Sequence, residues 1–474
     1  MARTRPMTAM VAFLLILSTV IPACQAHVAP RSTPANSSAD NQKYYDQVVR
    51  AMHPMTSTYC KASVPTVAEY KLPVIPGASS LQLEKVLLFA RHGDRSPIHP
   101  LIDDLANNVV WNCDANESMT LPDSKLVATK VSDVLSESWA PRSYMGTCAL
   151  GDLTAKGRAM HVDFGQKLRE IYVDRLGFLS RKLTLSELTW RATDVSRTIA
   201  SAQSVLDGLY PHGTYHHGER ITIRTRPYEV DPLHSSGLDK QCPKLKQLKT
   251  LAKKHPMWEQ ILNATTAARQ QVIALAPGVE AADTSKGSPE QIENLMCRRC
   301  WGKAQPCVNG MGCMSEATVD DAWLIKSLDY WYKDNYFPNH VQPETVSLAM
   351  GPLFREILGI VDGGSKAKLH LFLAHDSTLS GILGALRAAP EQHQWPAYRS
   401  NLIFEVWSGV EKGVRGKYVR ILNDGRSLVT DPDLVSDKPW CQFGGEHGET
   451  CTLDLFRVYL RAHSVDKWDE ACKV

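Results

Sequence analysis

The chain has 474 residues, 53 of them basic and 50 acidic, so its formal net charge of +3 leaves it close to neutral. A chain of this length can bury a large core, and we expect one sizeable α/β unit with an inserted subdomain. No long run of basic residues occurs, which argues against nucleic acid as a partner.

A targeting segment opens the chain, over residues 1–26. Arg3 and Arg5 precede an apolar stretch, and small residues at 24–26 resemble a cleavage site. The apolar core at 10–20 is short for a membrane-spanning helix of about 20 residues, although the whole of 7–26 just reaches that length. We therefore expect either a cleaved signal peptide or a retained anchor that tethers the chain through residues 7–26. Acylation of Cys24, as in a bacterial lipoprotein, is a third and weaker alternative.

The core α/β unit is expected over residues 80–211 and 345–460, after a linker or stem at 27–60 whose first part is rich in Pro, Ser, Ala and Asn. Its first strand is the apolar run 86–90, which ends in the sequence R-H-G-D-R-S-P at 91–97. Ligand sites of α/β folds lie at the carboxyl ends of such strands.

Arginine grips phosphate with paired hydrogen bonds, and Gly93 would let the backbone approach a ligand closely. The pattern predicts phosphoryl transfer through His92, with Arg91 and Arg95 on the phosphate. A basic surface turn after a core strand is the alternative.

A helix capped by Thr154 is expected next, and the segment 188–198 leads into a second helix, which Thr193 or Asp194 can cap and which places Arg197 in its first turn. A cation is unfavourable at a helix N-terminus, so its presence there suggests that Arg197 and the helix end both face an anion. Arg191 is the competing candidate, and we expect it to be structural.

Residues 212–344 combine clustered cysteines with charged amphipathic stretches and no strand pattern, which predicts a mostly helical, cysteine-rich cap. Its C-x-x-C pair could belong to a zinc site, but disulfides are favoured in a secreted chain. The four cysteines of this cluster allow three pairings, and the sequence does not choose among them: Cys297, Cys300, Cys307 and Cys313. Beyond Cys24 the chain has eleven cysteines, so one thiol is left over. Three N-x-S/T acceptors, at Asn36, Asn116 and Asn263, predict N-glycosylation.

The core resumes with a helical stretch at 345–358 and a second apolar strand at 369–374, which ends in His375 and Asp376. Helical spacing follows at once, and Asp376 is a favoured residue for its N-cap. Strands are expected at 401–408 and 418–422, with a hairpin turn at 423–425. The predicted fold is α/β, with a central mixed, largely parallel sheet flanked by helices and the helical cap inserted.

Together, R-H-G-x-R-x-P, the middle arginine before T-x-x-S at 198–201 and the late H-D identify the chain as a member of branch 2 of the histidine phosphatase superfamily. The resemblance implies that His92 is the nucleophile and that Asp376 is the proton donor. It also implies which side chains hold the phosphoryl oxygens: Arg91, Arg95, Arg197 and His375. Phosphomonoester hydrolysis would then proceed through a phosphohistidine, without a metal or any other cofactor.

The cysteine cluster and the segments 374–380, 401–407 and 419–422 resemble the 2-phosphoxylose phosphatase subfamily. The resemblance implies a phosphorylated sugar or glycan as substrate, namely the 2-phosphate of xylose in the proteoglycan linkage region, and a place in the Golgi lumen. The segment 191–194 is closer to secreted or lysosomal acid phosphatases, so a broad acid phosphatase or phytase is the alternative.

Two rivals belong to other functional classes. An inactive binding protein would be expected to have lost one of His92, Arg197 or Asp376, and all three are present. A phosphomutase-type transferase would use the same phosphohistidine, but the H-D ending and the secretory targeting disfavour it. The oligomeric state and the choice between cleavage and anchoring stay open.

Overall fold

The computed structural model describes residues 38–52, 58–101, 109–113, 127–131, 146–216, 220–276, 290–308, 310–335, 342–411, 413–431, 434 and 441–474. The chain divides into two units, Met1–Ala35 and Asn36–Val474, and every described residue belongs to the second. The targeting segment and two predicted glycosylation sites, Asn36 and Asn116, lie outside the described residues. Within the described ranges, no helix has the length and apolar character needed to cross a membrane.

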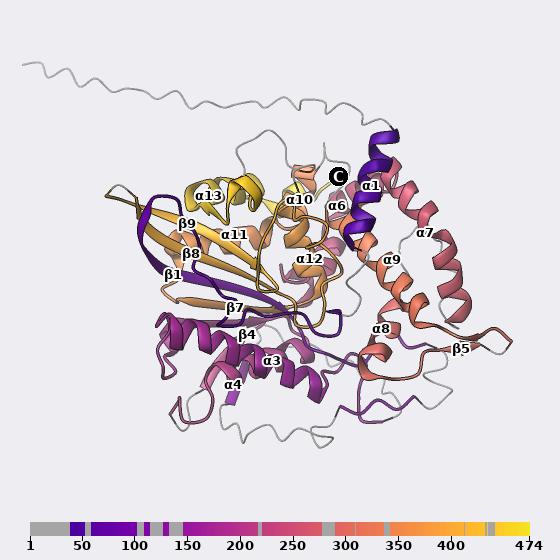
Figure 1. Ribbon diagram of the computed structural model, residues 1–474, viewed down its shortest axis with the longest axis horizontal. Helices are drawn as coiled ribbons and strands as arrows, with labels where there is room; N and C mark the ends of the chain where they lie inside the picture. The colour runs from indigo at the N-terminus through magenta and orange to yellow at the C-terminus, as the bar shows by residue number, and fades with distance from the viewer. Residues whose placement is uncertain are drawn as a thin grey trace, which may run out of the picture. The chain divides into compact units, whose positions relative to one another are not determined.

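One nine-stranded mixed sheet forms the centre of the described residues, in the order β10-β9-β8-β1-β7-β3-β4-β2, with β11 paired to β9 (Figure 1). Strands β1, β7, β3, β4 and β2 run parallel, and β8 to β11 add antiparallel pairs. The strand bounds are β1 Ala78–Arg91, β2 Val127–Val131, β3 Leu188–Ala192, β4 Arg220–Arg224, β7 Leu369–Ala374, β8 Asn401–Glu411, β9 Val414–Asn423, β10 Arg426–Ser427 and β11 Thr450–Thr452. The predicted fold class is confirmed.

Helices cover both faces of the sheet (Figure 1). Alternate residues of β1 point to opposite sides: Val86 and Leu88 pack in one apolar cluster and Leu87 and Phe89 in another. The first cluster includes α3 (Ala155–Leu168) and α4 (Ser196–Leu209), and the second includes α11 (Gly351–Gly359), α12 (Asp376–Ala385) and α13 (Leu453–Ala462). Because both faces are buried, the strand is a continuous apolar run.

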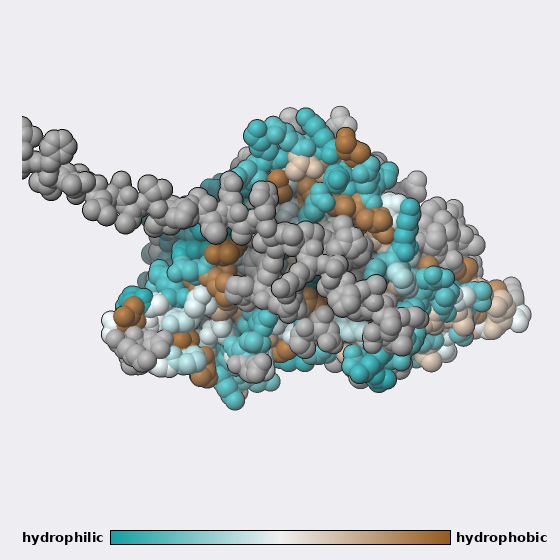
Figure 2. Space-filling model, turned by 90° about the horizontal axis from the view of Figure 1, so that it is seen from above, coloured by the Kyte–Doolittle hydropathy of each residue, from teal (hydrophilic) through white to brown (hydrophobic). Residues whose placement is uncertain are grey.

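The remaining helices are α1 Ser38–Met52, α5 Ser235–Gln241, α6 Pro243–Ala252, α7 Pro256–Leu275, α8 Ile292–Trp301, α9 Glu316–Asp334, α10 Gln342–Ala349 and α14 Trp468–Ala471. Two π-helical segments, Arg169–Arg175 and Ile360–Gly364, extend α3 and α11. Short 3₁₀ segments of the described residues include Leu185–Glu187, Tyr228–Val230 and Gly445–His447. On the face shown in Figure 2, the coloured surface is mainly hydrophilic, with hydrophobic residues scattered between.

The linker predicted over 27–60 is wrong for its later part. Residues 38–52 form α1, and Tyr45, Val48 and Met52 on this helix are buried in an apolar cluster with residues of α7 and α9. The residues before the helix are rich in Pro and Ser. The linker prediction extended this composition over the following residues and so passed over their helical spacing.

The range assigned to the cap, 212–344, contains one strand of the central sheet. Strand β4 pairs in parallel with β3, at Trp190 and Arg191. The helices α5 to α9 follow it, and a two-stranded sheet joins β5 (Cys307–Val308) to β6 (Gly312–Cys313). The helical content was therefore predicted, whereas β4 was not.

Five disulfides occur in the described residues: Cys60–Cys300, Cys113–Cys148, Cys242–Cys472, Cys307–Cys313 and Cys441–Cys451. Cys297 is buried and free, which accounts for the odd count. The zinc alternative is wrong, and so is the assumption that the four clustered cysteines pair among themselves, because Cys300 bonds to the distant Cys60. Asn263 lies exposed on α7, as a glycosylation acceptor must.

Candidate active site

His92 follows directly on the carboxyl end of β1, and its side chain is 2% exposed. Its Nδ1 lies 2.8 Å from the carbonyl oxygen of Gly93. A carbonyl can only accept a hydrogen bond, so Nδ1 carries the proton and the lone pair of Nε2 is free. The ring is thus held in the tautomer that a nucleophilic Nε2 requires.

Gly93 is small for a reason other than the expected approach of a ligand. A Cβ atom at this position would lie 2.4 Å from the carbonyl oxygen of Gly157, in the first turn of α3. A Cβ on Gly157 would meet the Asp94 backbone in the same way. The two glycines therefore let α3 pack directly against the turn that carries His92.

Burial lowers the pKa of His92 well below its usual value, and the cations Arg197, Arg91 and Arg95 lower it further. A protonated imidazole would be both desolvated and repelled by these charges. Both effects favour the neutral imidazole, which is the nucleophilic form.

Arg91 is fully buried and held on several sides. Its guanidinium donates to the Pro396 carbonyl oxygen at 2.6 Å and to the Tyr59 hydroxyl at 3.1 Å, and it pairs with Asp376 at 2.9 Å. The Tyr398 ring lies beneath it, with its centroid 4.6 Å from Cζ. These contacts fix the plane of the guanidinium beside His92 and Asp376.

His375 and Asp376 follow β7, which pairs in parallel with β1 so that Ala374 lies opposite Arg91. This register brings the two strand ends together, and the rings of His92 and His375 lie 5.8 Å apart. Nε2 of His375 lies 2.9 Å from the Thr193 hydroxyl, at the end of β3. His375, rather than the predicted Asp376, occupies the N-cap of α12.

The Asp376 carboxylate accepts a hydrogen bond from the Trp395 indole at 2.9 Å, on the same oxygen that pairs with Arg91. Burial alone would raise the pKa of Asp376, but Arg91, the Trp395 hydrogen bond and Arg95 outweigh it and hold the pKa below its usual value. In the unliganded site Asp376 is therefore ionised.

Two further arginines complete the cluster. Arg95 pairs with the buried Glu293 of α8 at 2.6 Å, and Arg197 lies in the first turn of α4, as expected. Burial, with repulsion from Arg95 next, lowers the pKa of Arg197 to about 9. Within the described residues the Nε atoms of Arg95 and Arg197 are buried without an acceptor. Three guanidinium groups thus face two carboxylates, and an anion would relieve their repulsion.

Arg191, the competing candidate for phosphate binding, is engaged by carboxylates outside this cluster. It forms ion pairs with Asp231 and with Glu356 of α11, and both its terminal nitrogens are engaged. The structure thus brings together all six predicted site residues and leaves Arg191 bound to other partners.

Several side chains around this cluster were not among the predicted site residues. Tyr59 precedes the core, and Trp395 and Tyr398 belong to the loop between α12 and β8. His234, at the N-terminus of α5, places its ring 4.4 Å from that of His375. Only tertiary contacts bring these residues to the site, and no local pattern marks them.

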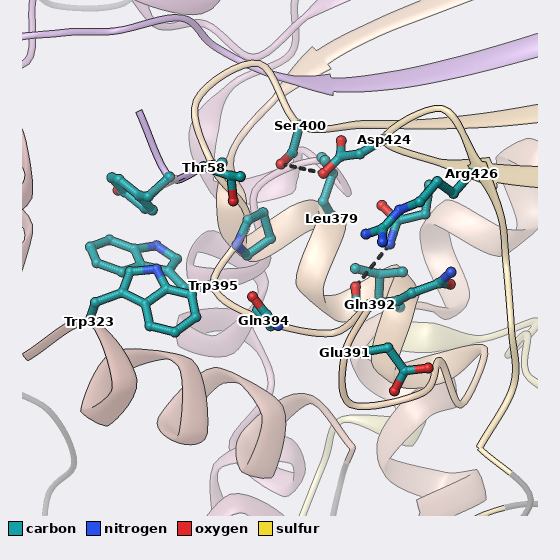
Figure 3. A pocket seen from close by; sticks show the side chains of 15 residues that line it. Thr58, Trp323, Leu379, Glu391, Gln392, Gln394, Trp395, Ser400, Asp424 and Arg426 are labelled. Carbon is teal, nitrogen blue, oxygen red and sulfur yellow. Dashed lines mark hydrogen bonds between the residues drawn. The ribbon is translucent and has the colours of Figure 1, made fainter. Parts of the chain in front are cut away.

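A small cavity of about 50 Å³ lies behind the loop that carries Trp395, with Trp323 of α9 also in its lining. Figure 3 shows the rings of Trp323 and Trp395 side by side and the hydrogen bond from Ser400 to Asp424. The loop that carries Trp395 and Pro396 is thereby supported from α9 as well as from the sheet. Among the residues that the structure describes, no group of three or more His, Cys, Asp or Glu side chains could hold a metal ion.

A family model described as "Histidine phosphatase superfamily (branch 2)" matches residues 82–424, well over half of the chain. The chain belongs to this superfamily. The membership predicted from the sequence motifs is confirmed. The chain is a histidine phosphatase, a phosphoric monoester hydrolase.

Three curated relatives are similar over most of their length. Counting factor 60 of Dictyostelium discoideum is 26% identical over 74% of this chain and 80% of its own. Human 2-phosphoxylose phosphatase 1 is 25% identical over 88% of both chains. Lysosomal acid phosphatase of Xenopus laevis is 26% identical over 84% of this chain and 81% of its own.

Among solved structures, the phytase from Citrobacter braakii matches with a TM-score of 0.52. It is 15% identical and covers 83% of this chain and 100% of its own, so the likeness concerns the fold. The five disulfides of this histidine phosphatase are typical of a protein that folds in the oxidising secretory route.

Proposed function

We propose that this histidine phosphatase hydrolyses phosphomonoesters through a phosphohistidine formed on Nε2 of His92. One observation carries the proposal: arginines whose charges are not fully compensated surround a buried, neutral His92. The Nδ1 of this ring donates to the Gly93 carbonyl oxygen. A phosphoryl group would satisfy the arginine donors as it transfers to the free nitrogen.

Each proposed role follows from the position of the side chain. Arg91, Arg95, Arg197 and His375 bind the phosphoryl oxygens and spread the negative charge as the bond to the leaving oxygen breaks. Asp376 gives a proton to the leaving alcohol, and in the second step it removes one from the water that attacks the phosphohistidine. Phosphate and the free imidazole are the products, so atoms and charges balance. The proposed chemistry uses no metal or other cofactor.

For the substrate, we propose the 2-phosphate of xylose in the glycosaminoglycan linkage region of proteoglycans, dephosphorylated in the Golgi lumen by a chain that residues 7–26 can tether. The similarity to human 2-phosphoxylose phosphatase 1 over 88% of the chain supports this substrate. The similarity to lysosomal acid phosphatase supports the second candidate, a broad acid phosphatase that is secreted or lysosomal.

The test of the chemistry is a phosphoenzyme trap. Wild-type protein is mixed with a ³²P-labelled aryl phosphate, quenched in alkali and assayed for acid-labile, alkali-stable label, beside His92→Ala and the exposed-histidine control His212→Ala. We expect label on the wild type and on His212→Ala, and none on His92→Ala. Label on His92→Ala would refute the nucleophile. A panel of 2-phosphoxyloside, phytate and aryl phosphate then separates the two substrate candidates by kcat/KM.

A further inference from the structure

Lys326 is a half-buried lysine near Asp376, the proposed proton donor, and its ammonium is not paired with any carboxylate that the structure describes. It lies on α9, where burial lowers the pKa of its ammonium and Asp329 is the acidic group that opposes this most. The Asp329 carboxylate, however, pairs with Lys333 at 2.7 Å. Within the described residues no hydrogen bond or ion pair reaches the Lys326 ammonium, which approaches only the Tyr330 ring, at 5.7 Å.

The same face of α9 leads to the active site. Trp323, Lys326 and Tyr330 are spaced three and four residues apart and therefore lie on one side of the helix. The Tyr330 ring is stacked with that of Trp395, with centroids 6.4 Å apart and planes at 13°. Trp395 in turn donates to Asp376, and the negative charge of Asp376 acts on both Lys326 and Tyr330.

The leaving alcohol must lie on this side of the phosphate, because Asp376 is the group that would protonate it. We propose that Lys326 and Tyr330 form a subsite for the leaving group, which favours phosphomonoesters whose alcohol part carries a carboxylate. The Tyr330 ring supplies a flat apolar face, and the ammonium supplies a partner for the anion. One ammonium matches a monoanion, whereas a second phosphate dianion would call for more cations than this face offers.

The subsite rests on the proposed function, so binding and turnover are measured separately. Binding is measured by calorimetry with benzylphosphonate and 4-carboxybenzylphosphonate, which differ only in the carboxylate and cannot be hydrolysed. Turnover is measured as kcat/KM for phenyl phosphate and 4-carboxyphenyl phosphate. We expect the wild type to prefer the carboxylated compound of each pair by about tenfold, the factor typical of one charge-assisted hydrogen bond.

Lys326→Met should abolish this preference, and Lys326→Arg should retain most of it. The matched control is Lys246→Met, an exposed lysine of α6 that lies outside this face, which should keep the full preference. A preference that is absent in the wild type, or that survives in Lys326→Met, would overturn the subsite. If the phosphonates show the preference while neither ester turns over, the subsite stands and the proposed chemistry fails.

Discussion

Asp376 meets two opposed requirements at a single carboxyl group. Arg91 and Trp395 keep it ionised in the free site, yet a proton donor has to carry a proton when substrate is bound. A bound phosphoryl dianion resolves the conflict, because its negative charge offsets the arginines and raises the pKa of Asp376. Binding of a dianion should therefore draw a proton onto this residue.

Sulfate tests this coupling, since it remains a dianion throughout the working pH range. We expect sulfate binding near pH 5 to be accompanied by proton uptake, because the pKa of Asp376 starts below its usual value and rises on binding. Calorimetry in two buffers of different ionisation enthalpy measures the number of protons taken up. The number should drop for Asp376→Asn, and an unchanged uptake in that variant would assign the proton to another group.

The two arginines of the middle segment should respond differently to removal. Arg197→Ala should weaken sulfate binding by tenfold or more, because it removes a cation from the anion site. Arg191→Ala breaks buried ion pairs with Asp231 and Glu356, so it should lower the free energy of unfolding by about 3–5 kcal/mol. Urea unfolding and sulfate titration of both variants check the assignment, and an inverted result would exchange the two roles.

Residues that sit at strand ends were predictable, and residues brought in by loops were not. His92, His375 and Asp376 follow apolar runs, so the strand-to-site rule located them. Arg197 was found because a cation at a helix start is out of place. Trp395 and His234 reach the site from a loop and from the end of a short helix, and nothing in their local sequence distinguishes them from core aromatics.

At the scale of elements, the Cys60–Cys300 bridge links the segment before β1 to the end of α8 across 240 residues of chain. The bridge is adjacent in sequence to Tyr59, whose hydroxyl accepts a hydrogen bond from the Arg91 guanidinium in the site. The bridge should therefore both stabilise the fold and hold Tyr59 in position as a partner of Arg91.

We expect the double variant Cys60→Ser and Cys300→Ser to lose about 2–5 kcal/mol of stability, since a bridge that closes a long loop restricts the unfolded chain most. The control is Cys307→Ser with Cys313→Ser, which opens a loop of 6 residues and should cost less. Urea unfolding of both double variants provides the comparison. Equal losses would mean that loop length does not govern the effect.

Strands buried on both faces were predicted correctly, and so were elements that begin or end at a clear capping or turn residue. The strand at 369–374 and the Thr154 cap occur as expected, and the turn after β9 has positive φ at Asp424 and Gly425, as a type I′ hairpin requires. Helix α1 was missed because it follows directly on a Pro- and Ser-rich segment, and β4 because it has only two apolar residues, Ile221 and Ile223. Both take their stability from tertiary partners.

Across the whole molecule, buried titratable groups of two kinds act on stability in opposite directions. Burial lowers the pKa of His161 and His393 to about 3, so unfolding is favoured as the pH falls from the unfolded value of about 6.5. Burial raises the pKa of Asp94 and Asp424 to about 6. Their stabilising effect is complete below about pH 4 and is lost as the pH rises through 6. The two contributions oppose each other between about pH 4 and 6.

Asp94→Asn isolates one of these groups, since the amide keeps an acceptor for the Thr154 hydroxyl but does not titrate. The wild type gains stability through Asp94 on acidification, and the variant cannot. We therefore expect the variant to be more stable relative to the wild type at pH 7.5 than at pH 5. Urea midpoints at the two pH values measure this, and a constant difference would show that Asp94 does not titrate in this range.

The place of β1 in the sheet has a consequence for biosynthesis. Its hydrogen-bonding neighbours, β7 and β8, begin at Leu369 and Asn401, so both edges of β1 stay without a partner until most of the chain has been made. At about 5–20 residues per second, the ribosome needs on the order of 15–60 s to reach β7 after completing β1. During that interval an apolar strand that aggregates readily is unprotected. The chain should thus depend on chaperones that hold it while translation continues.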